Sequence, residues 1–402
     1  MWRDTAAMPE YGRLEGDVRT DVLVIGGGMA GILCAHFLRQ AGVDCVLAEA
    51  DRLCAGTTGN TTAKITSQHG LVYDGLLRRF GAEKAGMYLH ANEAALARYR
   101  GMCREIDCGF EEKDAFVYSL DDRGKLEKEL AALEKLGFHA GFTDKRPLRF
   151  PVAGAVRFER QAQFDPLRFA AAAARGLRAY EHTPVRRLEG TSAVTDRGTI
   201  RAQKVIVATH FPFLNRHGSY FLKMYQHRSY VLALENAANV GGMYVDEAAE
   251  GLSFRNAQGM LLLGGGSHRT GKQGGGWREL EAFAKRHYPR AHIRYRWAAQ
   301  DCMTLDGIPY IGRFSSQTPE WYVATGFGKW GMSHSMVAAR LLTDLITGKE
   351  NPAKEVFTPS RFGWDAAESL AKQAGCTIKG YVGKRNATGG EHLEDLRPGE
   401  GH

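Results

Sequence analysis

Residues 21–50 read DVLVIGGGMAGILCAHFLRQAGVDCVLAEA, and this stretch decides the fold. Residues 21–25 contain a continuous run of apolar side chains, which is typical of a strand buried on both faces. Residues 30–41 place apolar side chains on one broad helical face, and Gly42 supplies the left-handed stop that commonly follows a helix. Residues 43–47 are a second apolar run, which ends at Glu49. The order predicts a strand–helix–strand unit.

The turn between the first strand and the helix has the spacing G-x-G-x-x-G at residues 26–31. In such a turn the first glycine permits the tight bend, the second lets backbone N–H groups approach a pyrophosphate, and the third lets helix and strand pack closely. The helix N-terminus adds unpaired N–H groups, and an acid ending the second strand accepts hydrogen bonds from ribose hydroxyls. An acid favours an unphosphorylated ribose, so the stretch predicts FAD or NAD rather than NADP. The predicted contacts are Gly26, Gly28, Met29, Ala30, Gly31 and Glu49.

The composition is that of an ordinary globular protein of two or three domains, with 402 residues, 44% apolar and 24% charged. The net charge of +8 does not indicate nucleic-acid binding, because no basic stripe carries interleaved aromatic side chains. No apolar run is long enough for a membrane span, and no signal-peptide pattern opens the sequence. Seven scattered cysteines without C-x-x-C suit a reducing compartment. We therefore expect a cytoplasmic protein, and no metal site.

The rest of the chain shows two kinds of pattern. Residues 204–209 are another doubly buried strand, and residues 321–346 repeat the strand–helix order of a parallel sheet. Residues 219–296 alternate short strands with Gly-rich turns, which indicates an antiparallel sheet. Helices are expected at 82–106, 122–136 and 166–179, strands at 110–120, 155–158 and 304–312, and a hairpin at 193–202. Residues 351–402 are expected to lie on the body as a polar tail, with a strand at 377–382.

A second glycine-rich turn, GFGKWG at residues 326–331, joins the late strand to the late helix. A helix N-terminus that enters the core can stabilise negative charge, and in a flavoenzyme such charge develops at the N1/C2=O edge of the isoalloxazine. The turn at residues 306–307 is expected to line the same cofactor. The predicted contacts of this part are Asp306, Gly326, Gly328, Trp330, Gly331 and Met332. Taken alone, the pattern also fits a plain strand–helix turn.

Residues 51–73 form a long loop rich in Gly, Thr and Ser, and loops of this length inside a compact domain are usually functional. Its hydroxyl and amide groups suit the phosphate and ribitol of a dinucleotide, and Lys64 adds a cation. The predicted contacts of the loop are Thr57, Thr58, Thr61, Thr62 and Ala63. A Thr-rich loop by itself also fits a merely solvated segment.

Together these motifs resemble the superfamily of FAD-dependent oxidoreductases that includes the D-amino-acid, glycine and sarcosine oxidases. The resemblance rests on the early glycine motif, the acid that ends the second strand, DGIPYIG at 306–312 and ATGF-x-x-x-G-M-S at 324–333. Three further strings are similar to a bacterial subgroup in which this module precedes a C-terminal Rieske iron–sulfur domain. They are GTTGNTTAKITSQHGLVY at 56–73, MYLHANEAA at 87–95 and QDCMTLDGIPYIG at 300–312. The resemblance covers about residues 10–360.

The resemblance implies tightly bound FAD and an α/β plus antiparallel β fold. A Rossmann-like FAD-binding domain of the glutathione-reductase type is expected to carry an inserted mixed cap domain. The expected FAD-binding domain comprises residues 1–85, 150–215 and 297–350, the cap 86–149 and 216–296, and the tail 351–402. A Rieske centre needs C-x-H and C-x-x-H ligand pairs, and the sequence has C-x-H only inside the first helix and no C-x-x-H. Electrons are therefore expected to leave this chain by another route.

The resemblance further implies oxidation of a C–N bond in a small amine or amino acid, with hydride transfer to flavin N5. Lys64 and Arg228 are candidates for anchoring the substrate, and Lys329 for bordering the ring. One alternative is a flavin module that passes electrons to a separate iron–sulfur or quinone partner. Another is an NAD(P)H-dependent reductase, which would need a second nucleotide motif and a redox cysteine pair. A flavin-binding protein without turnover is the third.

Several other polar residues have a plainer interpretation than a functional one. His69 fits a hydrogen-bonded loop histidine better than a flavin contact, and His210 fits a strand end better than a base. Cys302 fits a buried thiol better than a covalent flavin link. Cys103 and Cys108 are five residues apart, so they do not form a C-x-x-C pair and are expected to be core residues.

Overall fold

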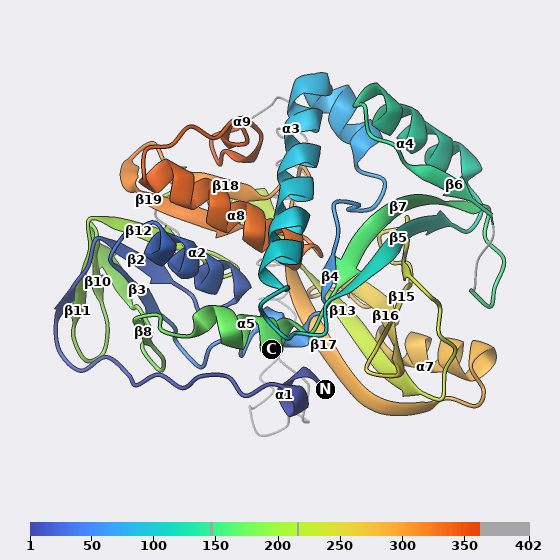
Figure 1. The fold of residues 1–402 in the computed structure, drawn as a ribbon, viewed down its shortest axis with the longest axis horizontal. Coiled ribbons are helices and arrows are strands. Elements are labelled where there is room, and N and C mark those ends of the chain that lie inside the picture. Colours follow the sequence, from blue (N-terminus) through green and yellow to red (C-terminus); the bar gives the residue numbers. More distant parts are fainter. Residues whose placement is uncertain (145–147, 215–216, 362–402) are drawn as a thin grey trace, which may run out of the picture.

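The computed structural model describes residues 1–144, 148–214 and 217–361 of the chain. Two large sheets, a small third sheet and the helices around them make up these residues (Figure 1). In this part of the chain no helix combines the length and the apolar character needed to cross a lipid bilayer.

The six-stranded sheet grows from the stretch at residues 21–50. Its strands, in spatial order, are β18 (Tyr310–Ser315), β19 (Thr318–Thr325), β12 (Lys204–Val207), β2 (Val22–Ile25), β3 (Cys45–Ala48) and β8 (Ala179–Tyr180). β18 is antiparallel to β19, and all other neighbours are parallel. The apolar runs at 21–25, 43–47 and 204–209 thus lie side by side in the sheet. The predicted parallel sheet is confirmed.

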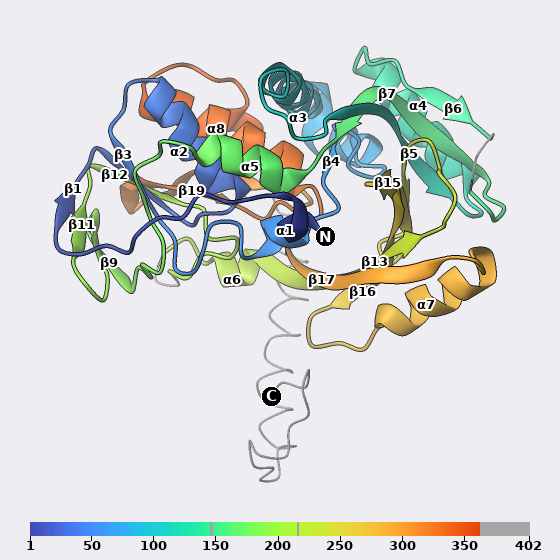
Figure 2. The ribbon, with the colours of Figure 1, turned by 60° about the horizontal axis from the view of Figure 1, so that its bottom comes forward.

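Alternate residues of β2 enter two different cores, which explains why the whole run is apolar. Val22 and Val24 share a core with α2 (Met29–Gln40) and α8 (Gly331–Ile346). Leu23 and Ile25 instead pack toward the small sheet on the other face. The small sheet contains β1 (Val18–Arg19), β11 (Thr199–Arg201), β10 (Ser192–Val194) and β9 (Arg187–Glu189). Figure 2 shows α2, α8 and α5 (Pro166–Ala174) together on one face of the six-stranded sheet.

The nine-stranded sheet forms the other half of the molecule. Its strands, in spatial order, are β17 (His292–Thr304), β13 (Met224–Glu235), β16 (Met260–Arg269), β15 (Ser253–Ala257), β14 (Met243–Asp246), β5 (Glu111–Ser119), β7 (Gly154–Gln163) and β4 (Lys64–Ile65), with β6 (Gly141–Thr143) beside β7. Only the β14–β5 pair is parallel. One face packs on α7 (Gly276–His287), with Leu232, Leu263 and Leu280 in the shared core.

A long helix, α3 (Tyr73–Met102), lies between the two halves (Figure 1). It is kinked at Gly81, whose φ of 78° and ψ of 171° are not helical. α4 (Arg123–Lys135) follows β5, and the Asp122 side chain caps it by accepting from the Lys125 N–H. The remaining short helices are α1 (Trp2–Thr5), the 3₁₀ turn η1 (Thr57–Asn60), α6 (Tyr220–Lys223) and α9 (Lys354–Phe357).

The structure corrects several predicted boundaries. The strand expected at 304–312 is wrong, because β17 ends at Thr304 and β18 begins at Tyr310. α3 begins earlier than the expected 82, since the kink at Gly81 interrupts the helical pattern. β7 and β17 both belong to the nine-stranded sheet, although residues 150–215 and 297–350 were expected in the FAD-binding domain. The division into domains stays a prediction. The strand expected at 377–382 lies outside the described residues.

Candidate functional site

A cavity of about 850 Å³ lies where the two large sheets meet. Ile25, Ala48, Ala208 and Thr325 line it, and each lies at or just beyond the carboxyl end of a parallel strand. In open α/β sheets, ligands bind in the crevice outside these strand ends. The other walls come from β13, β16 and β17 of the nine-stranded sheet. The volume lies in the upper part of the range of about 300–1,000 Å³ that is usual for small-molecule and cofactor sites.

The first glycine turn has no room for a side chain at Gly26 or Gly31. Gly26 has a φ of 107°, and a Cβ there would lie 2.6 Å from the Ala208 carbonyl oxygen. A Cβ on Gly31 would lie 1.8 Å from the Gly26 carbonyl oxygen. Gly26, Gly28, Met29 and Ala30 line the cavity, whereas Gly31 lies behind the turn. The sequence predicts this arrangement, in which Gly26 permits the bend, Gly28 faces the ligand and Gly31 lets helix and strand pack closely.

Glu49 lies at the end of β3 and faces the cavity. Its Oε2 accepts from the Gly27 N–H at 2.6 Å, and its Oε1 accepts from the Asp51 N–H at 2.8 Å. Two backbone donors therefore fix the carboxylate at the rim of the glycine turn. A fixed acceptor at this place suits the ribose hydroxyls of a dinucleotide.

The Thr-rich loop forms the next part of the wall. Thr57, Thr58, Thr61, Thr62 and Lys64 all line the cavity. The Thr58 hydroxyl accepts from the Met29 N–H at 3.0 Å, so it lies at the open N-terminus of α2. Ala63 does not line the cavity: it is fully buried, and its carbonyl accepts from the Arg255 guanidinium at 2.7 Å. The structure therefore places Ala63 behind the loop.

The second glycine turn meets the cavity from the opposite side. Its lining residues are Gly326, Phe327, Gly328, Lys329, Trp330, Gly331 and Met332. Gly326 has a φ of 72°, and a Cβ there would lie 2.4 Å from the Thr304 side chain. The N-terminus of α8 therefore opens directly onto the cavity, as the sequence predicts.

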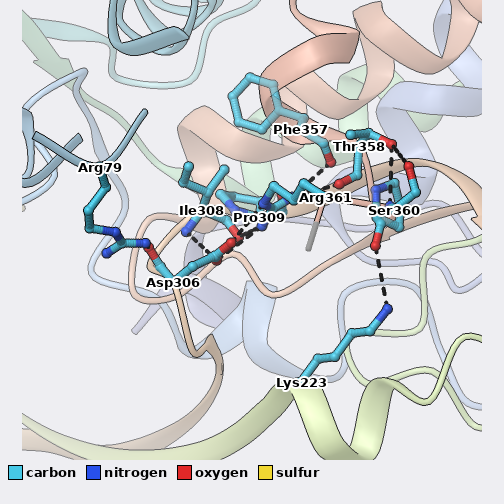
Figure 3. Close-up of polar contacts among 10 residues, drawn as sticks. Arg79, Lys223, Asp306, Ile308, Pro309, Phe357, Thr358, Ser360 and Arg361 are labelled. Atoms are coloured by element: carbon cyan, nitrogen blue, oxygen red, sulfur yellow. Dashed lines mark hydrogen bonds and ion pairs between the residues drawn. The ribbon is translucent and has the colours of Figure 1, made fainter. Parts of the chain in front are cut away.

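Asp306 does not face the cavity. Its carboxylate pairs with the Arg361 guanidinium through Oδ2–Nε at 2.8 Å and Oδ1–Nη2 at 3.1 Å (Figure 3). The Arg361 Nη1 group also donates to the carbonyls of Pro309, Phe357 and Thr358. Burial raises the pKa of Asp306, but Arg361 more than offsets this and holds the pKa below its usual value. Asp306 thus anchors the segment after α9, and its neighbour Gly307 lines the cavity instead.

Arg228 does not reach the cavity either. It is exposed, with its guanidinium 5.9 Å from the centre of the Tyr230 ring. On β13 the cavity is lined by Tyr225, His227 and Ser229 on one side of Arg228 and, past a register shift between Arg228 and Tyr230, by Tyr230 and Val231, but not by Arg228 itself. The structure therefore does not support substrate anchoring by Arg228.

Four ionisable side chains converge on the cavity wall beside the second glycine turn and the Thr-rich loop. His227 on β13 and Asp301 on β17 are cross-strand partners. The Lys329 Nζ donates to the Ala249 carbonyl at 3.2 Å and to the Ser267 hydroxyl at 3.3 Å. Lys64 belongs to the Thr-rich loop itself and donates to the Thr62 hydroxyl at 3.2 Å. This group of side chains is the chemically distinctive part of the cavity.

Burial dominates the titration of these groups. It raises the pKa of Asp301 to about 7, although Lys329 opposes the shift. It lowers the pKa of Lys64 to about 7, with a further contribution from Arg255. It lowers the pKa of Lys329 as well, against the attraction of Asp301. For His227, burial and then Lys329 lower the pKa to about 4. Perturbed groups gathered in a cleft are typical of functional sites.

The sequence alone does not single out Asp301. From the sequence no individual strand is expected at residues 292–303, where β17 runs. Ala299, Asp301 and Met303 alternate along β17 in the cavity wall, with Thr304 at the strand end also lining it, and this direction is set by the pairing of β17 with β13. His210 also lines the cavity, just past β12, and its buried Nε2 has no hydrogen-bond partner among the described residues.

The residues that line the cavity fit FAD. The first glycine turn, Glu49 and the threonines suit a pyrophosphate and a ribose, and the N-terminus of α8 suits an electron-rich ring edge. The residues that would hold FAD are Gly26, Gly28, Met29, Ala30, Glu49, Thr57, Thr58, Thr61, Thr62, Gly326, Gly328, Trp330, Gly331 and Met332. Among the described residues, no group of three or more His, Cys, Asp or Glu side chains could hold a metal ion.

Comparison with curated proteins finds relatives over nearly the whole length. YhfW of Bacillus subtilis (strain 168), whose name provisionally calls it a Rieske 2Fe-2S iron-sulfur protein, is 36% identical over 426 residues, covering 100% of this chain and 83% of the relative. Gamma-glutamylputrescine oxidoreductase of Escherichia coli (strain K12) is 24% identical over 376 residues, covering 84% of this chain and 86% of the relative.

Solved structures share the fold. Glycine oxidase from Geobacillus kaustophilus superposes with a TM-score of 0.73 at 20% identity, over 86% of this chain and 99% of that one. L-proline dehydrogenase from P. horikoshii gives a TM-score of 0.73 at 18% identity, and the match covers 87% of this chain and 98% of that one. The family described as DAO, FAD dependent oxidoreductase, matches residues 21–345. The chain therefore belongs to the DAO family of FAD-dependent oxidoreductases, and its cofactor is FAD.

Proposed function

We propose that this enzyme oxidises a C–N bond of a small amine or amino acid. The observation that carries the proposal is the continuity of the cavity, in which the FAD-binding turns and a chamber lined by Lys64, Lys329, Asp301 and His227 form one space. One relative named for gamma-glutamylputrescine and structures named for glycine and proline support this substrate class. When bound, FAD supplies the acceptor for the substrate hydride.

The side chains of the chamber suit a zwitterionic or amino-bearing substrate. Lys329 and Lys64 can each donate hydrogen bonds to a carboxylate, and the cavity wall lowers the pKa of both, although the Lys329 side chain is exposed and that of Lys64 is half-buried. Asp301, with a pKa near 7, can accept a hydrogen bond from the substrate nitrogen. Binding between these groups orients the C–H bond and excludes water, so no strong general base is required.

The proposal is tested by mixing the FAD-loaded enzyme anaerobically with a panel of amines and amino acids and following flavin absorbance. At least one compound of this class should bleach the flavin faster than NADH does. Lys329→Met should raise the KM for a carboxylate-bearing substrate about 10-fold or more, the cost of one hydrogen bond to a charged group. Lys272→Met, at an exposed position outside the cavity, is the matched control. Bleaching by NADH alone would overturn the proposal.

A second candidate function is electron transfer to a separate iron–sulfur or quinone partner. The observation that favours it is the 36% identical relative named as a Rieske protein. Under this alternative, the reduced enzyme reacts slowly with air and rapidly with an artificial electron acceptor. Rapid reoxidation by oxygen alone would instead mark an oxidase.

A further inference from the structure

Three buried side chains from different parts of the chain meet beneath the second glycine turn. The Tyr88 hydroxyl on α3 lies 2.7 Å from Nδ1 of His69 and 3.0 Å from Nε2 of His334, which is on α8. His69, Tyr88 and His334 are at most 8% exposed. We refer to these three side chains as the His–Tyr–His triad.

The outer nitrogen of each histidine faces a backbone carbonyl. Nε2 of His69 lies 2.7 Å from the Thr66 oxygen, and Nδ1 of His334 lies 3.0 Å from the Phe327 oxygen. A carbonyl oxygen can only accept, so each of these nitrogens carries a hydrogen. If both rings are neutral, the two inner nitrogens therefore carry lone pairs, and both of them face the same hydroxyl.

The triad is then one hydrogen short. The Tyr88 hydroxyl has a single hydrogen and can donate it to only one of the two inner nitrogens. The other contact, at 2.7 or 3.0 Å, sets a nitrogen lone pair against an oxygen lone pair. One additional proton removes the conflict, because one ring then donates to the Tyr88 oxygen while the hydroxyl donates to the other ring.

Burial opposes this additional proton in the resting protein. It lowers the pKa of His334 to about 4, and burial together with His334 lowers the pKa of His69 well below its ordinary value. Burial also raises the pKa of the Tyr88 hydroxyl, which keeps the phenol protonated. The hydrogen-bond deficit and the desolvation cost therefore act in opposite directions, and a negative charge nearby favours the protonated triad.

The triad lies beside the second glycine turn, whose residues would hold the flavin ring and where reduction would place a negative charge. His69 lines the cavity and stacks on Trp330, with ring centres 5.0 Å apart. His334 binds the carbonyl of Phe327, which also lines the cavity. Addition of a hydride equivalent to FAD leaves one negative charge on the ring unless a further proton arrives.

Other charged groups also face the triad. On the far side of Tyr88, Arg361 lowers the pKa of the phenol and Asp306 raises it. On α3 the neighbouring groups are Tyr73, whose ring centre lies 6.2 Å from that of Tyr88, and Glu93, which accepts from the Ser67 hydroxyl. Asp306 is already paired with Arg361, whereas the Glu93 carboxylate bonds to a neutral hydroxyl and keeps its negative charge.

We propose that His69, Tyr88 and His334 together bind one proton when the neighbouring FAD is reduced. Two electrons and one proton reduce the cofactor to its anion, and one further proton joins the triad, so the site gains no net charge. During turnover that proton is the one that the substrate nitrogen loses as the C=N bond forms. The inference rests on FAD binding and not on amine oxidation, because a chemical reductant produces the same charge.

The test measures the FAD reduction potential against pH with dithionite as the reductant. For a two-electron couple, each proton taken up contributes about 30 mV per pH unit. The wild type should show a slope about 30 mV per pH unit steeper than Tyr88→Phe, which lacks the bridging hydroxyl. Tyr73→Phe is the matched control, because the Tyr73 hydroxyl donates to the Ser67 carbonyl outside the triad. This variant should keep the wild-type slope. Protonation of Asp301 or Lys64 would affect all three proteins equally.

His334→Gln gives a second test that does not depend on the folding of Tyr88→Phe. A glutamine amide can donate to the Tyr88 oxygen without a charge and supplies the missing hydrogen. The slope should then match that of Tyr88→Phe. In ¹⁵N-histidine NMR of the wild-type holoenzyme, one imidazolium should appear on reduction. Equal slopes in all variants, or no change among the 14 histidines on reduction, would overturn the proposal.

Discussion

At the scale of single residues, Gly31 shows most directly how a side chain would destroy the FAD site. It lies in the first turn of α2, and its missing Cβ allows the Gly26 carbonyl to approach. No rotation of a side chain can relieve a contact between a Cβ and a backbone oxygen. The glycine is therefore required by packing and not by its φ angle.

Gly31→Ala should destabilise the protein by about 1–3 kcal/mol or more, because the new Cβ overpacks the turn. FAD content after purification should fall with it, since the turn that faces the pyrophosphate must move. Thermal unfolding and flavin absorbance measure the two effects. Gly86→Ala, in open space on α3, should be neutral or slightly stabilising. Wild-type flavin content in Gly31→Ala would contradict the assigned packing role.

Lys64 predicts a pH dependence of stability. Its pKa falls from 10.5 in the unfolded chain to about 7 in the folded protein, mainly through burial. Below about pH 7 Lys64 is protonated in both the folded and the unfolded chain, and the cost of burying its ammonium group is largest. Between about pH 7 and 10.5 the unfolded chain binds more protons than the folded one. The free energy of unfolding therefore rises with pH in this range.

Lys64→Met should therefore be more stable than the wild type near pH 6, and the difference should shrink toward pH 10. Urea unfolding of the holoenzyme across this range measures it. Lys272→Met, at an exposed position, controls for the loss of a lysine charge. A difference that does not vary with pH would show that Lys64 is not desolvated in the folded state.

At the scale of elements, the Asp306–Arg361 pair fixes the segment after α9 to the irregular stretch between β17 and β18 (Figure 3). The two side chains are 19% and 9% exposed, so removing one partner leaves a largely buried charge. The Arg79 guanidinium also donates to the Asp306 carbonyl at 2.8 Å, which connects α3 to the same place.

Arg361→Met should cost about 3–5 kcal/mol of unfolding free energy. The loss should be constant between about pH 5 and 8, because Asp306 has a lowered pKa and stays ionised there, and the pair's contribution is lost only below about pH 3.8. Arg186→Met breaks an equally bidentate but exposed pair with Asp196 and should cost at most about 1 kcal/mol. Equal effects in both variants would contradict the role of burial.

The elements that the sequence predicts well are those with a strong local pattern. Both glycine turns, their strands and their helices are found as predicted, because the turn geometry and the doubly buried strands depend on neighbouring residues. β17 was missed because its pairing with β13 joins residues about seventy positions apart. The structure does not support the predicted roles of Asp306 and Arg228, and here too the cause is contacts between residues far apart in the sequence. A distant arginine takes the Asp306 carboxylate, and the direction of the Arg228 side chain depends on strand register.

At the scale of the whole molecule, β13 connects the two halves. Met224 at its start packs in the core between the six-stranded and the small sheet, and Leu232 and Leu234 pack in the core beneath α7. β17 pairs with it along nearly its whole length. The two cores therefore share a continuous hydrogen-bonded ladder.

Because of this ladder we expect the two halves to unfold together. Calorimetry of the holoenzyme should give a single transition, and free FAD at about 100 times its Kd should add about 2.7 kcal/mol of stability. Comparison of scans with and without added FAD measures the effect. Two resolved transitions, of which only one responds to FAD, would contradict shared folding of the halves.

The long β13–β17 ladder also limits how small molecules can enter and leave. Both strands belong to the nine-stranded sheet, and Met224 at the start of β13 packs in the core beside the six-stranded sheet, so a hinge between the two sheets would have to disrupt that core. Substrate exchange should therefore depend on smaller movements at the rim of the cavity, where residues 247–249, Gly251 and Lys329 line the wall outside the helices and strands. The turnover rate should accordingly be more sensitive to bulkier side chains at these rim residues than to a cross-link between the two halves.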